Sequence, residues 1–363
     1  MESLTESPTE SVTETPTESH LDSSGGLGIP LSVLDLSPVS AGSTPADALR
    51  SSTELIGVVE RLGYTRYWVA EHHNMPGIAS SSPPVLLAHL AAHSERIRLG
   101  SGGVMLPNHA PLVVAEQFGM LVALHPGRID LGIGRAPGTD QLTAEALRRT
   151  SPQADDFPER LVELRAYFSG EFPANHRYRG ITATPGKGYA PSLWLLGSSN
   201  YSAYAAGVLG LPFSFAHHFA AENTLPAVDT YLEHFTPSDD LAEPYVMLGV
   251  NVVCAPTEEE AQYLAGSGTL SFVRLRQGRP GPLPTPEEAA SHDYSPAEAQ
   301  VIRQRRASQI VGDPTSVERQ LRELAERTQA NELMITTMVH DPALRIRSYE
   351  LVAESCLAGT SVR

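Results

Sequence analysis

Eight short apolar segments recur along the chain, each followed by a longer amphipathic segment. They lie at residues 29–36, 66–72, 97–106, 128–134, 193–199, 212–218, 246–255 and 332–338. Short, nearly continuous apolar runs separated by helical patterns are typical of buried parallel strands joined by crossover helices. Eight such units favour an α/β fold of the (β/α)8 or TIM-barrel type. An open doubly wound sheet is disfavoured, because no GxGxxG turn follows the first strand.

The starts of several helices can be located from their capping residues. Thr44-Pro45-Ala46-Asp47 offers a capping hydroxyl, a proline in the first turn and an acid at the third helical position, a pattern that predicts a helix beginning here. Gly63 predicts its end. Thr257 before three glutamates, Ser295-Pro296 and Asp313-Pro314 predict three further starts.

Two regions depart from the repeating pattern. Residues 1–28 are rich in Ser, Thr, Glu and Pro, with a glutamate every fourth residue, and we expect a disordered acidic tail. The barrel then occupies residues 29–363. Residues 256–331, between the seventh and eighth strands, are too long for a simple crossover, so we expect an insertion at about 256–310. An insertion after a strand lies over the C-terminal face of a barrel, so this one is predicted to form a lid.

The composition excludes several functions. Lys and Arg total 26 against 42 Asp and Glu, a formal charge of −16. This balance argues against binding to nucleic acid or to anionic lipid. The two cysteines, Cys254 and Cys356, have neither metal-site nor disulfide-framework spacing. We expect a cytoplasmic protein, since neither a signal peptide nor a run of about 20 apolar residues is present.

Polar side chains at the ends of the predicted strands are the candidates for chemistry, because barrel enzymes place their sites at the C-terminal face. The candidates are Asp35, Glu71-His72-His73, Gly102-Gly103, Arg135, Ser198-Ser199, His217-His218, Asn251 and Thr336-Thr337. The histidines would suit a zinc or iron hydrolase. Their spacing contains no HxxH or HExxH pattern, so we expect no metal.

Three segments resemble the signature blocks of the luciferase-like flavin monooxygenases, the family of bacterial luciferase. They are YWVAEHHNMPG at 67–77, LGSGGVMLPNHAPLVVAEQFGMLVALHPGRIDLGIGRAPGTD at 99–140 and LWLLGSSNYSAYAA at 193–206. The middle segment is the most specific because of its length. The resemblance extends from about residue 29 to residue 356 and implies a barrel that binds FMN.

The resemblance also implies roles for individual residues. His72 matches the catalytic histidine beside the flavin, where it acts as a base or hydrogen-bond partner. Gly102-Gly103 matches a non-prolyl cis peptide against the flavin ring. Arg135 matches the arginine that binds the FMN phosphate, and Gly134 stands where the light-emitting luciferase subunit has a reactive cysteine. The remaining phosphate-binding candidates are Ser198, Ser199, Tyr201 and Ser202.

Four weaker candidates are predicted to face the substrate. They are Asp35, His73, His218 and Asn251. A histidine or amide at a strand end more often satisfies a loop or the core, so their assignment rests on position alone. Trp68 and Trp194 lie inside strands and are interpreted as core residues.

The resemblance predicts a monooxygenase that uses reduced FMN and O2, through a flavin 4a-hydroperoxide, to oxygenate a small organic substrate. A separate NAD(P)H:flavin reductase would supply the reduced FMN, because no second nucleotide motif is present. A homodimer is also implied, with the helices flanking the second and third strands as its expected interface. The alternatives are a deazaflavin-dependent hydride transfer and a non-catalytic flavin-binding relative. The sequence leaves the substrate open.

Overall fold

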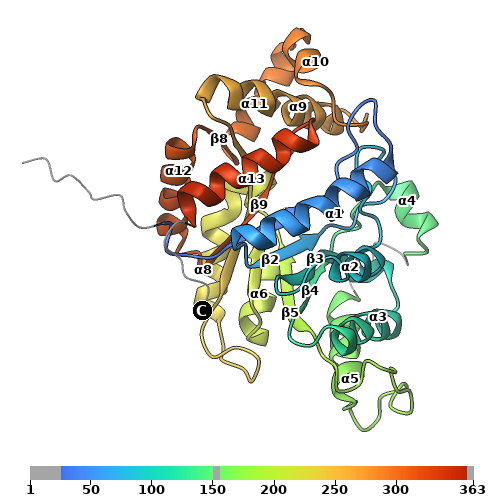
Figure 1. Cartoon of the computed structure of the whole chain (residues 1–363). Helices are drawn as coiled ribbons and strands as arrows, with labels where there is room; N and C mark the ends of the chain where they lie inside the picture. The colour runs from blue at the N-terminus through green and yellow to red at the C-terminus, as the bar shows by residue number, and fades with distance from the viewer. Residues whose placement is uncertain (1–25, 150–155, 358–363) are drawn as a thin grey trace, which may run out of the picture.

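The computed structural model describes residues 26–149 and 156–357, and its centre is a closed ring of parallel strands (Figure 1). The ring runs in the order β1, β2, β3, β4, β5, β6, β7, β9, and β9 pairs with β1. Its strands are β1 (Leu31–Asp35), β2 (Arg66–Val69), β3 (Arg98–Met105), β4 (Ile129–Gly134), β5 (Ser192–Gly197), β6 (Phe213–Phe215), β7 (Val246–Cys254) and β9 (Glu332–Thr336). The predicted TIM barrel is therefore confirmed.

The helices surround this ring. Those following the first six strands are α1 (Pro45–Leu62), α2 (Pro83–Ala91), α3 (Pro111–Leu124), α4 (Gln141–Ala146), α5 (Phe157–Ser169), α6 (Asn200–Leu209), α7 (His217–Ala220) and α8 (Thr224–His234). The remainder are α9 (Glu258–Arg276), α10 (Pro286–Ser291), α11 (Pro296–Arg306), α12 (Pro314–Thr328) and α13 (Pro342–Cys356). Two 3-10 turns are η1 (Leu106–Asn108) and η2 (Ala221–Asn223).

The predicted helix starts are confirmed. Thr44 caps α1, and its side chain and that of Asp47 form a reciprocal capping box. Gly63 ends this helix in the left-handed conformation, at φ 90°, which glycine adopts without a steric penalty. Thr257 and Asp313 cap α9 and α12 in the predicted way, and Ser295 forms a second capping box at α11.

The sequence analysis missed one strand. β8 (Gln309–Gly312) pairs in parallel with the second half of β7 and lies outside the closed ring. Its four residues contain only the apolar pair Ile310-Val311, between Gln309 and Gly312, which is too short a run to distinguish from a loop. Within the insertion, β8 anchors the end of α11 to the barrel.

The insertion itself consists of α9, α10 and α11, which lie together at one end of the molecule (Figure 1). Leu283 donates to the Val39 carbonyl and accepts from the Ala41 N–H, each at 2.8 Å. The carbonyl of Gly281 lies so near Gly77 that a Cβ there would come within 2.2 Å of it. These contacts place the insertion against the loops that follow β1 and β2, at the C-terminal face of the barrel.

A buried ionic cluster occupies the opposite end of the barrel. Arg66 donates to Asp130 at 2.9 Å and to Glu332 at 3.1 Å, and Tyr245 donates to Glu332 at 2.8 Å. Trp68 donates to Asp130 and packs edge-on against Trp194, with ring centroids 5.3 Å apart. Both tryptophans are buried, as interpreted from the sequence, although Trp68 also lines a cavity at the C-terminal face of the barrel. Buried charges are tolerated when they are paired in this way.

The predicted tail, residues 1–28, lies outside the described residues except for residues 26–28. Within residues 26–28, the Leu27 N–H donates a hydrogen bond to the Cys356 carbonyl at 2.7 Å. Tyr64 likewise donates to the Tyr349 carbonyl at 2.9 Å. These two bonds join the start of the barrel to its last helix. No helix in the described part of the chain is long and apolar enough to cross a membrane.

Candidate active site

A cavity of about 490 Å³ opens at the C-terminal face of the barrel. This volume lies within the range of about 300–1,000 Å³ that is usual for small-molecule and cofactor sites. Most of its wall is apolar and includes Leu34, Trp68, Leu196 and Met334. The cavity therefore combines a largely apolar wall with a small number of polar groups.

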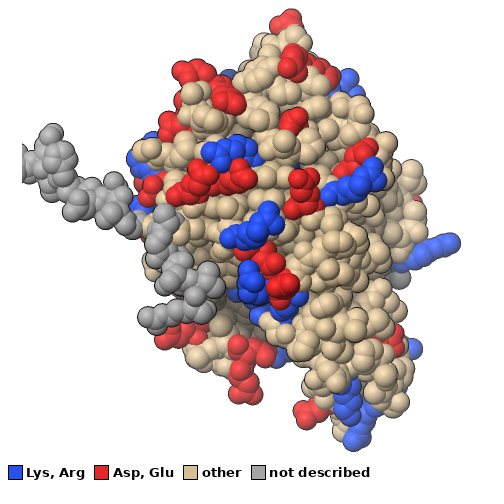
Figure 2. Space-filling model, in the orientation of Figure 1, with Lys and Arg blue, Asp and Glu red and all other residues tan. Residues whose placement is uncertain are grey.

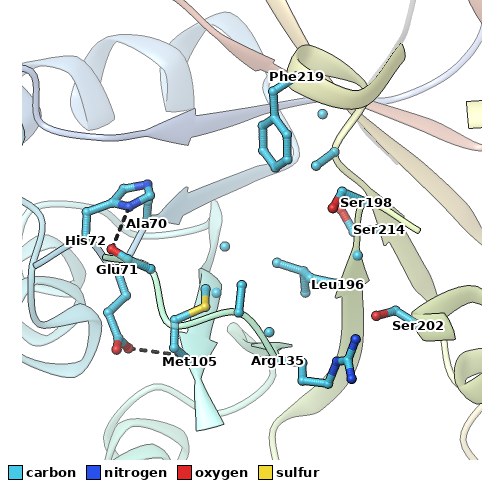
Figure 3. A pocket seen from close by; sticks show the side chains of 18 of the residues that line it. Ala70, Glu71, His72, Met105, Arg135, Leu196, Ser198, Ser202, Ser214 and Phe219 are labelled. Atoms are coloured by element: carbon cyan, nitrogen blue, oxygen red, sulfur yellow. Dashed lines mark hydrogen bonds between the residues drawn. The ribbon is translucent and has the colours of Figure 1, made fainter. Parts of the chain in front are cut away.

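His72 lies on one side of this cavity, next to Glu71 (Figure 3). Its Nδ1 is 3.2 Å from the Gly138 carbonyl. A carbonyl can only accept, so in the neutral ring Nδ1 carries the proton and Nε2 keeps a lone pair. Burial lowers the pKa of His72 below its ordinary value. The ring is therefore neutral at pH 7 and offers an acceptor nitrogen.

Glu71 holds the loops after β2 and β3 together, a function that the sequence analysis missed. It accepts from His109 at 2.9 Å, from His73 at 3.0 Å and from the Met105 N–H at 3.1 Å. Burial alone would raise the pKa of Glu71, but the bonds from His109 and His73 outweigh it and lower the pKa. Glu71 thus stays ionised, directly beside His72 in the chain.

The opposite side of the cavity presents groups suited to an anion. Arg135, at the end of β4, has its guanidinium 4.2 Å from the ring centroid of Tyr201, which holds the charged group in place. Ser198, Ser199 and Ser202 line the wall at the N-terminus of α6, and Ser199 makes no capping hydrogen bond with its side chain. A helix N-terminus with serine hydroxyls beside an arginine is a suitable phosphate site. Figure 3 shows Ser198 and Ser202 across the pocket from His72.

Two glycines form part of the cavity wall between these sides. Gly102 and Gly103 both line it, and the peptide bond between them is cis. The cis bond that the resemblance implies is therefore confirmed. A Cβ on Gly103 would meet the Gly132 carbonyl at 2.8 Å, and one on Gly102 would meet Leu34 at 2.7 Å. A larger residue is therefore excluded by backbone at Gly103, whereas at Gly102 it would require the Leu34 side chain to shift.

Of the four weaker candidates, only His218 lines the cavity. Its Nδ1 lies 3.1 Å from the Gly249 carbonyl, and burial lowers its pKa to about 4. His73 is bonded to Glu71 instead and is absent from the cavity wall. Asn251 is buried in β7, beyond the wall formed by Gly249. The expectation that His73 and Asn251 face this cavity is therefore corrected.

Asp35 also lies outside the cavity wall. Leu34 lines the cavity, and neighbouring residues of a strand point to opposite faces. Asp35 accordingly faces outward, where it accepts from Arg345 at 2.8 Å and from Tyr67 at 2.6 Å. Burial would raise the pKa of Asp35, but Arg345 and the hydrogen bonds hold it below its ordinary value. Asp35 is thus half of a buried ion pair, and its assignment to the substrate is corrected.

No group of three or more His, Cys, Asp or Glu side chains within residues 26–149 and 156–357 is arranged to hold a metal ion. Phe219, Met105 and Arg149 line the cavity and were not among the sequence candidates. Phe219 directly follows His218, so its position could have been inferred from that of its neighbour.

Known proteins share both the sequence pattern and the fold of this chain. Residues 29–331 match the family model of the luciferase-like monooxygenases. A luciferase-like monooxygenase of Escherichia coli (strain K12) is 44% identical over 327 residues, 90% of this chain and 96% of that protein. The N-acetyl-S-alkylcysteine monooxygenase of Bacillus subtilis (strain 168) is 37% identical over 333 residues, 91% and 99% of the two chains. The chain therefore belongs to the luciferase-like monooxygenase family.

Solved structures share the fold. The crystal structure of apo-MsnO8 matches with a TM-score of 0.83 and 40% identity, covering 92% of this chain and 99% of that one. The oxygenating constituent of 3,6-diketocamphane monooxygenase, solved with FMN, has a TM-score of 0.69 at 19% identity over 93% and 100%. An F420-dependent secondary alcohol dehydrogenase has a TM-score of 0.64 at 14% identity over 90% and 99%. At these lower identities the likeness is one of fold.

Proposed function

We propose that this protein is an FMN-dependent monooxygenase that uses O2 to oxygenate a small organic substrate. The observation that carries the proposal is one cavity with His72, a neutral acceptor, on one side and an anion-binding end on the other. Membership of the luciferase-like monooxygenase family supports it. FMN is the cofactor of one protein with the same fold, whereas another depends on F420.

The residues of the cavity fit FMN. Arg135 and the hydroxyls of Ser198, Ser199 and Ser202 would bind the phosphate, because a guanidinium fork and free hydroxyls suit a dianion. Gly102 and Gly103 would lie against the flavin ring, since neither presents a side chain to it.

When bound, reduced FMN supplies the two electrons with which O2 gives one oxygen atom to the substrate and the other to water. Nε2 of His72 would accept a hydrogen bond or a proton near the reacting atoms. The apolar wall, which includes Leu34, Leu196 and Met334, would exclude water from them.

The electrons would come from a separate NAD(P)H:flavin reductase. The chain lacks the GxGxxG nucleotide-binding motif after its first strand, and the cavity has one anion-binding end formed by α6 and Arg135. Oxidation of NADPH or NADH by the purified chain alone would contradict the need for a separate reductase.

The test is an anaerobic titration of the purified chain with reduced FMN, oxidised FMN and an F420-type deazaflavin, followed by mixing with O2. Binding of reduced FMN and rapid O2 uptake by the complex are expected. Binding of the deazaflavin alone, without O2 uptake, would instead assign the protein to hydride transfer.

Arg135→Ala is expected to weaken FMN binding by at least about tenfold, because a charged hydrogen bond contributes about 1.5–3 kcal/mol. Riboflavin, which lacks the phosphate, provides the matched control, and its affinity should be nearly unchanged. Quenching of flavin fluorescence measures the affinities for FMN and for riboflavin. An equal loss for the two ligands would show that Arg135 acts on the flavin ring and not on the phosphate.

We also propose that the protein is a homodimer formed by α2 and α3. These neighbouring helices expose several large apolar side chains, including Leu124 at 65% and Met120 at 53%. The surface around them carries little charge (Figure 2), and Glu116 and His89 are the only titratable residues in the two helices. Uncharged apolar patches of this kind mark protein interfaces.

Leu124→Glu is therefore expected to convert the dimer into a monomer, because it places a charge in the apolar interface. Size-exclusion chromatography with light scattering measures the change. Val208→Glu, on the exposed face of α6, is the control and should leave the dimer intact. A monomeric wild-type chain would refute the proposed interface.

A further inference from the structure

His218 is a second histidine of the cavity, and one of its nitrogens is held by the barrel. It lies in α7, just after β6, and lines the same cavity as His72. Its Nδ1 is 3.1 Å from the Gly249 carbonyl. Because a carbonyl can only accept, Nδ1 carries the proton and Nε2 keeps a lone pair. Within residues 26–149 and 156–357, no hydrogen bond reaches that Nε2.

The neighbours of His218 fix the position of its ring. A Cβ on Gly249 would come within 2.7 Å of its Nδ1 and within 3.0 Å of its Cε1, so the ring packs directly on the backbone of β7. The ring of Phe219 contacts it edge-on, with the two centroids 4.6 Å apart. Burial lowers the pKa of His218 to about 4. At pH 7 the ring is therefore a neutral acceptor in a fixed place, as the ring of His72 is.

The charged side chains of the cavity wall are engaged elsewhere. Glu71 directs its carboxylate to the loops that follow β2 and β3. Arg149 donates to the Arg135 carbonyl at 3.0 Å, which places it at the phosphate-binding end. Asp156 forms an ion pair with Arg160. In the part of the chain that the structure describes, no charged group is thus left to neutralise a charge beside His218.

The wall around His218 is otherwise apolar. Phe219 is 57% exposed, and Figure 3 shows its ring pointing into the pocket. Met334, on β9, is the register partner of Gly249 and packs with Leu34 in one apolar cluster. Both of these side chains line the cavity. Burial of an apolar group against them is favourable, whereas a charged group would lose its hydration without compensation.

We propose that the substrate is an uncharged molecule, apolar over most of its length, that donates an O–H or N–H hydrogen bond to Nε2 of His218. The inference rests on the proposed function and specifies its substrate class. His218 would bind the donor group, and Phe219 and Met334 would contact the apolar part. His72, on the wall of the same cavity, would remain available to the reacting atoms.

The test measures binding of hexan-1-ol, methyl pentyl ether and hexylammonium to the full-length chain by saturation-transfer NMR titration, with and without FMN. Hexan-1-ol and methyl pentyl ether are isomers, and only the alcohol has a donor. Wild-type protein is expected to bind the alcohol about fivefold more tightly than the ether, the usual contribution of one neutral hydrogen bond. Hexylammonium retains donors but adds a charge, so it should bind at least about tenfold more weakly than the alcohol.

Three variants separate the acceptor from the shape of the site. His218→Phe keeps an aromatic ring but has no acceptor, and it should abolish the preference for the alcohol. His218→Gln can place a side-chain oxygen where Nε2 lies and should retain part of the preference. His217→Asn changes the neighbouring histidine, which is bonded to Thr224 and is absent from the cavity wall, and should leave the preference unchanged. FMN affinity, measured by fluorescence, should be the same in all three variants and the wild type.

Several results would overturn the inference. Equal binding of the alcohol and the ether by the wild type, or no binding of the alcohol at millimolar concentration, needs no variant to do so. A His218→Phe variant that retains the preference would remove His218 from the binding site. Equal or tighter binding of hexylammonium would overturn the assignment of an uncharged substrate. A wild type that binds no flavin would refute the proposed function, while the preference measured without flavin would still test His218.

Discussion

Replacing His72 with alanine is expected to lower the rate of substrate oxygenation by at least about 100-fold, the usual contribution of a positioned acid or base. The neutral ring offers Nε2 to the cavity while Nδ1 is held by the Gly138 carbonyl. Alanine removes this acceptor but leaves the phosphate-binding end, with Arg135 and the α6 serines, unchanged. The affinity for FMN should therefore change little. Oxygenated product formed per reduced FMN consumed is the quantity to measure.

The pH profile provides a second test of His72. Burial lowers its pKa below the ordinary value of 6.5, so the ring is neutral at pH 7 and above. Activity of the wild type should be level between about pH 7 and 8 and fall as the pH decreases through that lowered pKa. His234→Ala, on the exposed surface of α8, is the control. Unchanged oxygenation by His72→Ala would contradict the role assigned to His72.

Arg345→Met is expected to destabilise the protein by about 3–5 kcal/mol, because it leaves Asp35 as an uncompensated buried charge. Asp35 is fully buried and accepts from Arg345 at 2.8 Å. Urea unfolding followed by circular dichroism measures the loss. Arg347→Met provides a matched control two residues away, since Arg347 pairs with Glu350 and Glu354 at the surface. Exposed pairs contribute at most about 1 kcal/mol.

The same ion pair predicts the direction of the pH dependence. The pKa of Asp35 is lower in the folded chain than its ordinary value of 3.8. Its stabilising contribution is therefore fully present above that ordinary value and is lost as the pH falls through the lowered one. The difference in stability between wild type and Arg345→Met should accordingly shrink in strong acid. A difference that stays constant down to pH 2 would contradict the assigned pairing.

Much of the fold could be predicted because local signals agree with the global arrangement. The apolar runs coincide with all eight strands of the ring, and the caps at Thr44, Thr257, Ser295 and Asp313 begin helices where predicted. β8 was missed because its pairing depends on β7, more than fifty residues earlier, and not on its own composition. A strand of four residues carries too little periodicity to be recognised.

The site was predicted less completely. His72, Arg135 and the α6 serines were found through motif order, and they do line one cavity. Asp35 was misplaced because a strand end alone does not determine which face a side chain takes, whereas alternation with Leu34 does. The contact of Glu71 with His109 gave no signal in the sequence, because it joins two loops 38 residues apart.

The bonds between the first and last elements have a consequence for how the chain acquires its structure. Asp35 meets Arg345, Ser32 donates to Glu332, and Leu27 meets Cys356. A ribosome therefore delivers the carboxylate of β1 some 310 residues before its counter-charge. Closing so long a loop carries a large entropic cost. Until α13 emerges, a growing chain holds an incomplete ring with an unmatched acid in its first strand, so the barrel can close only after this helix has been synthesised.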